Sequence, residues 1–267
     1  DGAGFAAGVL GGRLPALSAG SGGIGRAVAW LFARLGAEVV LTGRDPGRLD
    51  AAVEGLRAAG HAASGRRLAI RDRAAVDAFW AEPGASGPAD ILVHSAGGQF
   101  PQPAIDFTPG GWNAVIETNL TGTWNMMQAA ARGWRDLGRG GAIVNIVVVT
   151  THGLYGVAHS VAARSGVIGL SRSVAVEWAP LGIRINCVAP GAIETEGWNV
   201  YTPEARAAYP RSNPMMRAGS AWDIAEACAY LSTDAGRFVT GEVLTVDGGG
   251  QLWGETWTTG KPAYFEP

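Results

Sequence analysis

The chain has almost no lysine. Of its 21 basic residues only Lys261 is a lysine, and the others are arginines. Lysine is the basic side chain that forms Schiff bases and shifts its pKa readily when buried, whereas arginine stays protonated. Because Lys261 lies close to the C-terminal end, we expect no lysine chemistry in the body of the chain.

Cysteine, net charge and long apolar runs are also scarce. The two cysteines, Cys187 and Cys228, have neither the spacing of a metal site nor that of a disulfide framework, which favours buried thiols in a reducing cytoplasm. The formal net charge is −2 and the basic residues form no block, which argues against nucleic acid as a partner. No apolar run reaches about 18 residues, so we expect no membrane partner. Because the cysteines lack the spacing of a metal site, we also expect no metal.

Short apolar runs alternate with helix-length amphipathic stretches along the whole chain, and apolar residues make up 47% of it. This alternation is typical of βαβ units, whose strands are covered by helices on both faces. It predicts a single Rossmann-type α/β domain with a doubly wound, seven-stranded parallel sheet. Strands are expected at 13–18, 37–42, 65–70, 89–95, 141–149, 183–189 and 242–246, and helices at 23–36, 46–59, 73–82, 111–137, 157–179 and 221–232. Asp72 and Asp223 are expected to be N-caps.

No linker or repeat divides residues 1–267, so we expect one domain. Residues 191–219 are too many for a simple connection and are expected to form a substrate lid. The C-terminal tail, 250–267, is rich in aromatic residues, and we expect it to dock on its own domain or on a neighbouring subunit. These aromatic residues are Trp253, Trp257, Tyr264 and Phe265.

A glycine-rich loop follows the first expected strand in "LSAGSGGIGRAVAWLFARLGAEVVLTGR". Gly22, Gly23 and Gly25 let the backbone turn tightly and approach a pyrophosphate, which the free N–H groups of the new helix would hold. A glycine loop alone is a weak signal. The order of strand, loop, helix and second strand makes it a strong one.

Several segments together resemble the short-chain dehydrogenase/reductase superfamily from about Arg13 to Gly249. They are the glycine loop, "HSAGG", "ETNLTGTW", "IRINCVAPGAIET" and "FVTGEVLTVDGGG". The stretches "GGQFPQPAIDFTPGGWNAVIETNLTGTW" and "AHSVAARSGV" are most similar to its peroxisomal trans-2-enoyl-CoA reductase and 2,4-dienoyl-CoA reductase branch. The resemblance implies an oxidoreductase with a nicotinamide dinucleotide and a small-molecule substrate. It also implies a homodimer or homotetramer formed through the helices at 111–137 and 157–179.

The resemblance also implies which residues hold the cofactor. Arg44 follows the second strand, which has no acidic residue at its end, and would pair with a 2′-phosphate, implying NADP(H). An ordinary exposed arginine is the alternative. In "PGAIET", the backbone of Ile193 and the hydroxyl of Thr195 would hold the nicotinamide carboxamide. The alternative is that the segment is only a Pro-Gly turn that ends a strand. The full set is Ser21, Gly22, Gly23, Ile24, Gly25, Arg44, Ala96, Gly97, Arg164, Pro190, Gly191, Ile193 and Thr195.

Four departures from the family pattern predict weaker dinucleotide binding. Ala19 stands where the family has glycine, and its Cβ would crowd the ribose. Pro15 falls inside an expected central strand, where it would remove a ladder hydrogen bond. Ala69 replaces the acidic residue expected after the third strand, and His94 with Ser95 replaces an Asn-Asn pair.

The usual catalytic pair of the family is absent. The tyrosine position is Ser160, the lysine position is Arg164, and the position of the family's serine falls at Val147 or Val148, whereas Asn119 is retained. Ser160 and Arg164 are four residues apart and so share one helix face. Arg164 can clasp ribose hydroxyls but cannot relay protons, and a serine hydroxyl is a poor general acid. Ordinary carbonyl reduction is therefore disfavoured.

Enoyl reduction depends on donors that stabilise an enolate oxygen. Among the candidates, Tyr155 is the first choice because a phenol is suitably acidic, and His159 is the second because the enoyl-CoA reductase branch has the same "HS". The alternative for each is a packing or capping role. The full set of candidates in this loop and first helical turn is Thr150, Thr151, His152, Tyr155 and His159.

Three functions remain open. The first is NADP(H)-dependent reduction of an activated C=C or C=O bond, as in an enoyl thioester. The second is a non-redox isomerase, lyase or cyclase of specialised metabolism on the same scaffold, since fold does not fix function. Trp198, Trp253 and Trp257 suit a bulky apolar substrate, but they equally suit packing. The third is a catalytically silent subunit that pairs with an active homologue.

Overall fold

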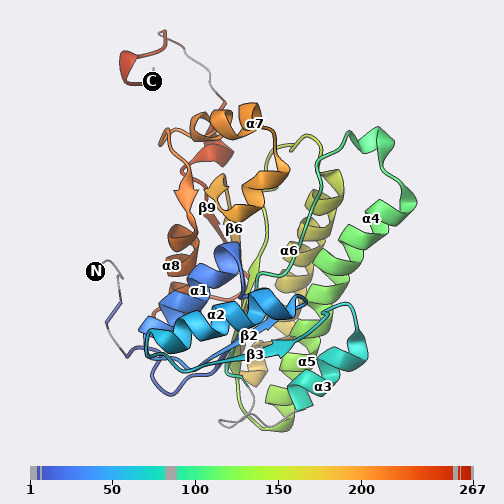
Figure 1. Ribbon diagram of the computed structural model, residues 1–267, viewed down its shortest axis with the longest axis vertical. Coiled ribbons are helices and arrows are strands. Elements are labelled where there is room, and N and C mark those ends of the chain that lie inside the picture. Colours follow the sequence, from blue (N-terminus) through green and yellow to red (C-terminus); the bar gives the residue numbers. More distant parts are fainter. Residues whose placement is uncertain (1–4, 7, 82–88, 255–257, 259, 266–267) are drawn as a thin grey trace.

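Seven parallel strands form one sheet at the centre of the molecule (Figure 1). The computed structural model describes residues 5–6, 8–81, 89–254, 258 and 260–265, so Trp257 lies outside the described residues. The order across the sheet is β3-β2-β1-β4-β5-β6-β9, and every neighbouring pair is parallel. The strands are β1 Pro15–Ser18, β2 Val39–Gly43, β3 Ala63–Arg67, β4 Ile91–His94, β5 Gly141–Ile146, β6 Ile183–Pro190 and β9 Val243–Val246. The predicted Rossmann-type sheet is confirmed.

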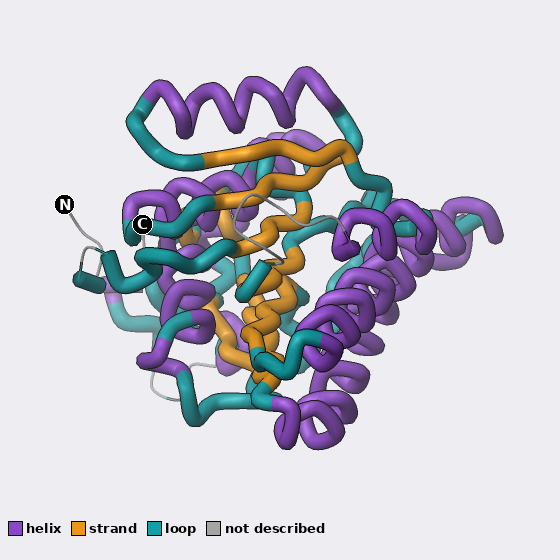
Figure 2. The backbone as a smooth tube through the Cα atoms, turned by 90° about the horizontal axis from the view of Figure 1, so that it is seen from below, coloured by secondary structure: helices purple, strands orange, loops and turns teal. Residues whose placement is uncertain are grey.

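Helices cover both faces of the sheet, which Figure 2 shows as a twisted layer between them. One face carries α1 Gly23–Arg34, α2 Pro46–Ala58 and α8 Ala221–Ser232, and the other carries α3 Arg73–Ala81, α5 Gly122–Asp136 and α6 Ala158–Trp178. Within β1, Leu17 joins the first core and Ala16 the second, because successive strand side chains point to opposite faces. This explains why the strands are apolar on both faces.

The helix predicted at 111–137 is interrupted. It consists of α4 Pro109–Ile116, a π-helical segment η2 Glu117–Thr121, and α5. Two threonine hydroxyls bond to backbone carbonyls four residues earlier in this region. The Thr118 hydroxyl donates to the Ala114 carbonyl at 2.8 Å, and the Thr123 hydroxyl donates to the Asn119 carbonyl at 2.7 Å. Single π-helical turns are frequent at functional sites, and this one contains Asn119.

Three local predictions need correction. Asp223 is not the N-cap of α8: Ser220 is, and Asp223 is its partner in a capping box. The third strand runs over Ala63–Arg67 rather than 65–70. Pro15 is the first residue of β1, a position that tolerates proline, and pairing with β2 begins one residue later. Asp72 does accept a hydrogen bond from the backbone of Ala75, as expected of an N-cap.

The segment 191–219 has secondary structure of its own. Its short strands β7 Ile193–Glu194 and β8 Gly219–Ser220 pair with each other, and between them lie η4 Glu196–Val200, α7 Pro203–Ala208 and η5 Tyr209–Arg211. Figure 1 shows this segment at the top of the view, near the upper end of α6. In the tail, Trp253 stacks on Phe265 with ring centroids 5.2 Å apart. No helix of the described part of the chain is long and apolar enough to cross a membrane.

The capping box of α8 makes a stability prediction. Ser220→Ala removes the side-chain acceptor for the backbone N–H of Asp223, and we expect the free energy of unfolding to fall by about 1 kcal/mol. Urea denaturation measures this loss. Ser165→Ala, on the exposed face of α6, is the matched control and should change stability far less. Equal losses in both variants would contradict the capping assignment.

Candidate functional site

The candidate site lies at the carboxyl ends of β1, β4, β5 and β6. In an open parallel sheet ligands bind beyond these ends, at the point where the strand order reverses. Here the reversal falls between β1 and β4. The loops that follow these strands carry the glycine loop, "HSAGG", the predicted donor loop and "PGAIET". The sheet thus gathers segments that are far apart in the sequence.

The glycine loop is closely packed and its helix end is open. Gly23 has φ +50°, and a Cβ on Gly25 would lie 2.3 Å from the carbonyl oxygen of Ala19, so both positions require glycine. Gly22 gives α1 no side-chain cap, and the first turn of α1 has no acidic residue. The N–H groups of that turn are therefore free to hold an anion. Ala19 itself has φ +56°, a conformation that costs a non-glycine residue energy.

Two arginines and one carboxylate border this loop. Arg48 Nη2 lies 2.9 Å from Glu196 Oε2, and Arg26 Nη1 lies 3.5 Å from Glu196 Oε1. A Cβ on Gly22 would lie 2.6 Å from Arg48 Nη2 and 3.7 Å from Glu196 Oε2. Thr195 lies over Gly23, 3.7 Å from where its Cβ would be. The start of segment 191–219 is thus held directly beside the glycine loop.

His94 is buried and fixed by Ser18. The Ser18 hydroxyl oxygen accepts from the backbone N–H groups of Ser95 and Ala96, each at 3.0 Å, so its own proton points to His94 Nδ1, also at 3.0 Å. Burial first, and then the charge of Arg164, lower the pKa of His94 to about 3. The ring is therefore neutral at physiological pH with its proton on Nε2, which has no partner among the described residues.

Asn119, Ser160 and Arg164 come together, as predicted. Asn119 Oδ1 accepts from the N–H of Gly98 at 3.0 Å, and its Nδ2 donates to the Gly98 carbonyl at 2.9 Å and to Ser160 Oγ at 3.5 Å. Arg164 Nη1 donates to the carbonyl of Ile146, and a Cβ on Gly97 would lie 2.5 Å from Arg164 Nη2. Burial lowers the pKa of Arg164 to about 10, so it remains a cation at neutral pH.

The predicted donors are not brought to this cluster. Tyr155 is 88% exposed, and Thr150, Thr151 and His152 are exposed as well. His159 is buried between Phe100 and Phe107, with ring centroids at 4.5 and 4.4 Å, and its Nδ1 accepts from the N–H of Ser160 at 2.8 Å. Its position is that of a packing residue.

The other predicted cofactor residues lie at or just beyond the carboxyl ends of β1, β2, β4 and β6. Gly191 packs against the residue that follows β9, since a Cβ on Gly191 would lie 2.6 Å from the Cβ of Asp247, and Ile193 is buried in the core. Thr195 Oγ1 accepts from the N–H of Gly197 at 3.2 Å. Arg44 is exposed at the end of β2. The others, at 21–25, 96–97 and 190, lie in the loops and strand ends described above.

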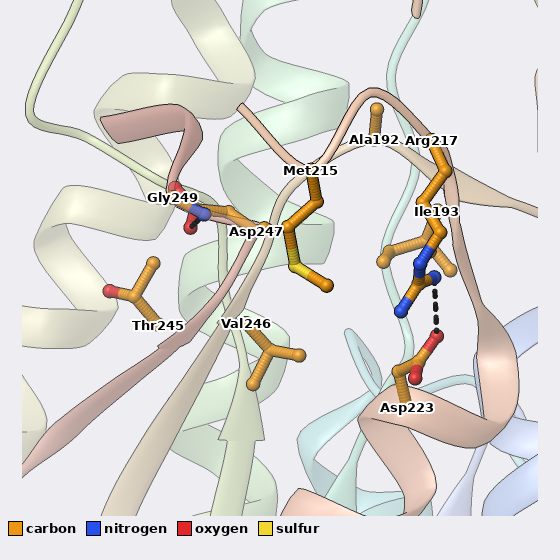
Figure 3. Close-up of a pocket in the computed structure, with 11 residues that line it drawn as sticks. Ala192, Ile193, Met215, Arg217, Asp223, Thr245, Val246, Asp247 and Gly249 are labelled. Carbon is orange, nitrogen blue, oxygen red and sulfur yellow. Dashed lines mark hydrogen bonds and ion pairs between the residues drawn. The ribbon is translucent and has the colours of Figure 1, made fainter. Parts of the chain in front are cut away.

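A pocket of about 280 Å³ lies below the chain that connects β6 to α8 (Figure 3). Met215 points into it, and Arg217 faces Asp223 with 3.7 Å between Nη1 and Oδ2. Its lining includes Ile193 but neither Asn119 nor Arg164. It is therefore separate from the group formed by Asn119, Ser160 and Arg164, which we call the polar cluster.

Sequence reasoning missed three contact residues. Arg48 and Tyr201 lie outside every motif quoted above, and Gln99 lies in the quoted stretch that begins at Gly97 but had no assigned role. Gln99 hydrogen-bonds Tyr201 across 102 positions, and Arg48 pairs with Glu196 across 148. The only signal was the length of segment 191–219, to which Glu196 and Tyr201 belong.

Proteins of known sequence and structure resemble this chain over most of its length. The family model described as "Enoyl-(Acyl carrier protein) reductase" matches residues 18–251. A Bacillus subtilis (strain 168) protein assigned as a 2,4-dienoyl-CoA reductase is 38% identical over 239 residues, which are 87% of this chain and 94% of the relative. The peroxisomal 2,4-dienoyl-CoA reductase of Arabidopsis thaliana is 35% identical over 261 residues, 92% of this chain and 86% of the relative.

A solved structure with bound NADP is also similar. It is assigned as a 2-deoxy-D-gluconate 3-dehydrogenase from Agrobacterium tumefaciens. It superposes with a TM-score of 0.83 at 33% identity, over 91% of this chain and 98% of that one. The fold is therefore shared with a protein whose structure holds NADP.

Buried neutral His94 makes a prediction about stability and pH. Its pKa is lower in the folded chain than the ordinary value of 6.5, so below that value the unfolded chain binds more protons and stability falls as the pH falls. We expect His94 to contribute a loss of about 2 kcal/mol between pH 7 and roughly pH 5. Urea denaturation at several pH values in this range should show that the free energy of unfolding depends less on pH in His94→Asn than in the unchanged protein.

The exposed His152 provides the control. His152→Asn should keep the pH dependence of the unchanged protein. An identical dependence in His94→Asn and in the unchanged protein would show that His94 is not buried as a neutral ring.

Proposed function

The chain belongs to the short-chain dehydrogenase/reductase family, and from this premise we propose that it is an NADP(H)-dependent oxidoreductase. It reduces an activated C=C or C=O bond, as in an enoyl thioester, without the Tyr–Lys pair usual in that family. Two relatives are named as 2,4-dienoyl-CoA reductases, which supports a thioester substrate. The bound NADP of the similar structure supports the cofactor.

The observation that carries this proposal is the convergence of Asn119 and Arg164 on the loop after β4. Arg164 lies against Gly97 and Asn119 holds Gly98 on both its N–H and its carbonyl. No carboxylate of the described residues pairs with Arg164. Its planar guanidinium is therefore available to two ribose hydroxyls of a nicotinamide nucleotide.

The residues present fit such a cofactor. The uncapped first turn of α1 suits a pyrophosphate, and Gly25 allows the helix to approach the loop. Arg44 and Arg48, at the end of β2 and the start of α2, would hold a 2′-phosphate. When bound, NADPH supplies the hydride. The protein residues bind and orient it, and stabilise the charge that develops on the substrate oxygen.

Two observations favour the non-redox alternative. Glu196 places a carboxylate beside the loop that would hold a pyrophosphate, and Ala19 holds a strained backbone where the family has glycine. An isomerase, lyase or cyclase, or a silent subunit, would not need that loop to be free. Measured NADPH affinity separates these functions, because only the reductase needs tight binding and turnover.

Three further proposals accompany the function. Segment 191–219 is a substrate lid, supported by the position of Thr195 and Glu196 above the glycine loop. The protein is a homodimer or homotetramer, as the resemblance implies. It is cytoplasmic, which the two free, buried cysteines support.

Replacing Arg164 tests the ribose contact. Arg164→Ala removes charge-assisted hydrogen bonds, and we expect NADPH affinity to fall by roughly tenfold to a hundredfold. Titration of nicotinamide fluorescence measures it, and Arg164→Lys should fall in between. Arg172→Ala, exposed further along α6, is the control. Unchanged affinity in Arg164→Ala would refute the ribose contact, and no binding to the native protein at millimolar NADPH would refute the reductase.

Replacing Glu196 tests the carboxylate at the phosphate loop. Glu196→Gln removes a negative charge beside Gly22 and frees Arg26 and Arg48, which it pairs. Because these groups are about half exposed, we expect NADPH affinity to rise only about threefold to fivefold. The matched control is Glu204→Gln, an exposed lid carboxylate. Weaker binding in Glu196→Gln would mean that Glu196 itself contacts the nucleotide.

A further inference from the structure

Segment 191–219 brings a phenol to the polar cluster. Tyr201 follows η4 and is half-buried, and its hydroxyl oxygen accepts a hydrogen bond from Gln99 Nε2. Gln99 directly follows Gly97 and Gly98, the residues that contact Arg164 and Asn119. The Tyr201 hydroxyl therefore lies beside the loop that Asn119 and Arg164 hold in place.

A second phenol supports the first. The Tyr209 ring packs edge-on against Tyr201, with centroids 5.5 Å apart, and against Trp198 at 5.0 Å. Burial, and then the charge and hydrogen bond of Tyr201, raise the pKa of Tyr209 to about 12. Tyr209 thus keeps its proton at all physiological pH values. Its role is to hold the Tyr201 ring and to offer that ring's oxygen a hydrogen bond.

The hydrogen bonds leave the proton of Tyr201 available. Its oxygen accepts from Gln99, so its own O–H is not used in that contact. Burial lowers the pKa of Arg164, and the charge of Tyr201 acts on that pKa in the opposite direction, so the two side chains are close enough to interact. A phenol that has given up its proton would therefore be left beside a permanent cation and neutral donors, the surroundings that stabilise an oxyanion.

We propose that Tyr201 is the proton donor of this site, a catalytic residue carried by the lid segment instead of by α6. The proposal rests on the reductase function proposed above. A hydride from the reduced nicotinamide, with its electron pair, forms the new C–H bond of the substrate. The displaced π pair moves to the carbonyl oxygen, the O–H bond of Tyr201 breaks, and its proton bonds to that oxygen. Water then returns a proton to the phenolate.

For an enoyl thioester the hydride goes to the β-carbon, and the enol so formed isomerises to the saturated thioester. For a ketone the hydride goes to the carbonyl carbon and the product is the alcohol. In both cases the substrate gains one hydride and one proton. The other candidates lie less well: Tyr155 is largely exposed, and His159 is enclosed by two phenylalanine rings.

The test compares isosteric Tyr→Phe variants of the full chain, assayed with NADPH and three probes. The probes are a trans-2-enoyl-CoA, a 2,4-dienoyl-CoA and a 3-oxoacyl-CoA. With a probe that the native protein reduces, Tyr201→Phe should lower kcat by roughly 10²- to 10⁴-fold with little change in KM. NADPH affinity, read by fluorescence, should be unchanged, which shows that the variant is folded.

Two variants give the comparison. Tyr230→Phe, on the exposed side of α8, should keep native activity. Tyr155→Phe compares the exposed phenol of the loop before α6 with the lid phenol, and should lose far less activity than Tyr201→Phe. Native kcat in Tyr201→Phe, or the larger loss in Tyr155→Phe, overturns Tyr201 as the donor while the reductase function stands. A native protein that binds NADPH but reduces none of the three probes overturns both.

Discussion

The two hydrogen bonds between the Asn119 side chain and the backbone of Gly98 are the constraint on which the site depends. They join the π-helical turn to the loop after β4. Gly97, on one side of Gly98, then lies against Arg164, and Gln99, on the other, reaches Tyr201. Because an amide offers one acceptor and one donor side, a single asparagine fixes this loop in both directions. Asn119 therefore acts mainly by positioning backbone.

Charge is arranged in two different ways at the carboxyl ends of the strands. Glu196 at the glycine loop is paired with two exposed arginines, and such pairs are weak and readily exchanged for another anion. Arg164, by contrast, is half-buried, bonded to the Ile146 carbonyl, and without a carboxylate partner among the described residues. Beside it, burial keeps His94 neutral. The cation is thus held where developing negative charge would be stabilised most strongly.

The sequence predicted the sheet and the glycine loop because each depends on local pattern. The Asn119–Ser160–Arg164 set came from the resemblance to the family, and helical spacing added only that Ser160 and Arg164 share one face. An apolar run such as that of β5 can be recognised as a strand in the sequence itself. The π-helical turn at Glu117–Thr121 could not be predicted, since one added residue leaves the apolar periodicity of the helix almost unchanged. The prediction that Asp223 is an N-cap was wrong because aspartate is favoured both at the N-cap and in the first turn of a helix, and only the backbone geometry distinguishes the two positions.

The sequence by itself determined the fold, because burying apolar runs on both faces of parallel strands leaves few arrangements. Through its resemblance to the family, it also predicted that Ser160 and Arg164 stand in place of the usual tyrosine and lysine. Only the tertiary structure decided which hydroxyl lies near that arginine. Tyr201 and Gln99 are 102 positions apart, and contacts over such separations are set by how segment 191–219 folds back over the ends of the strands, which no local pattern encodes.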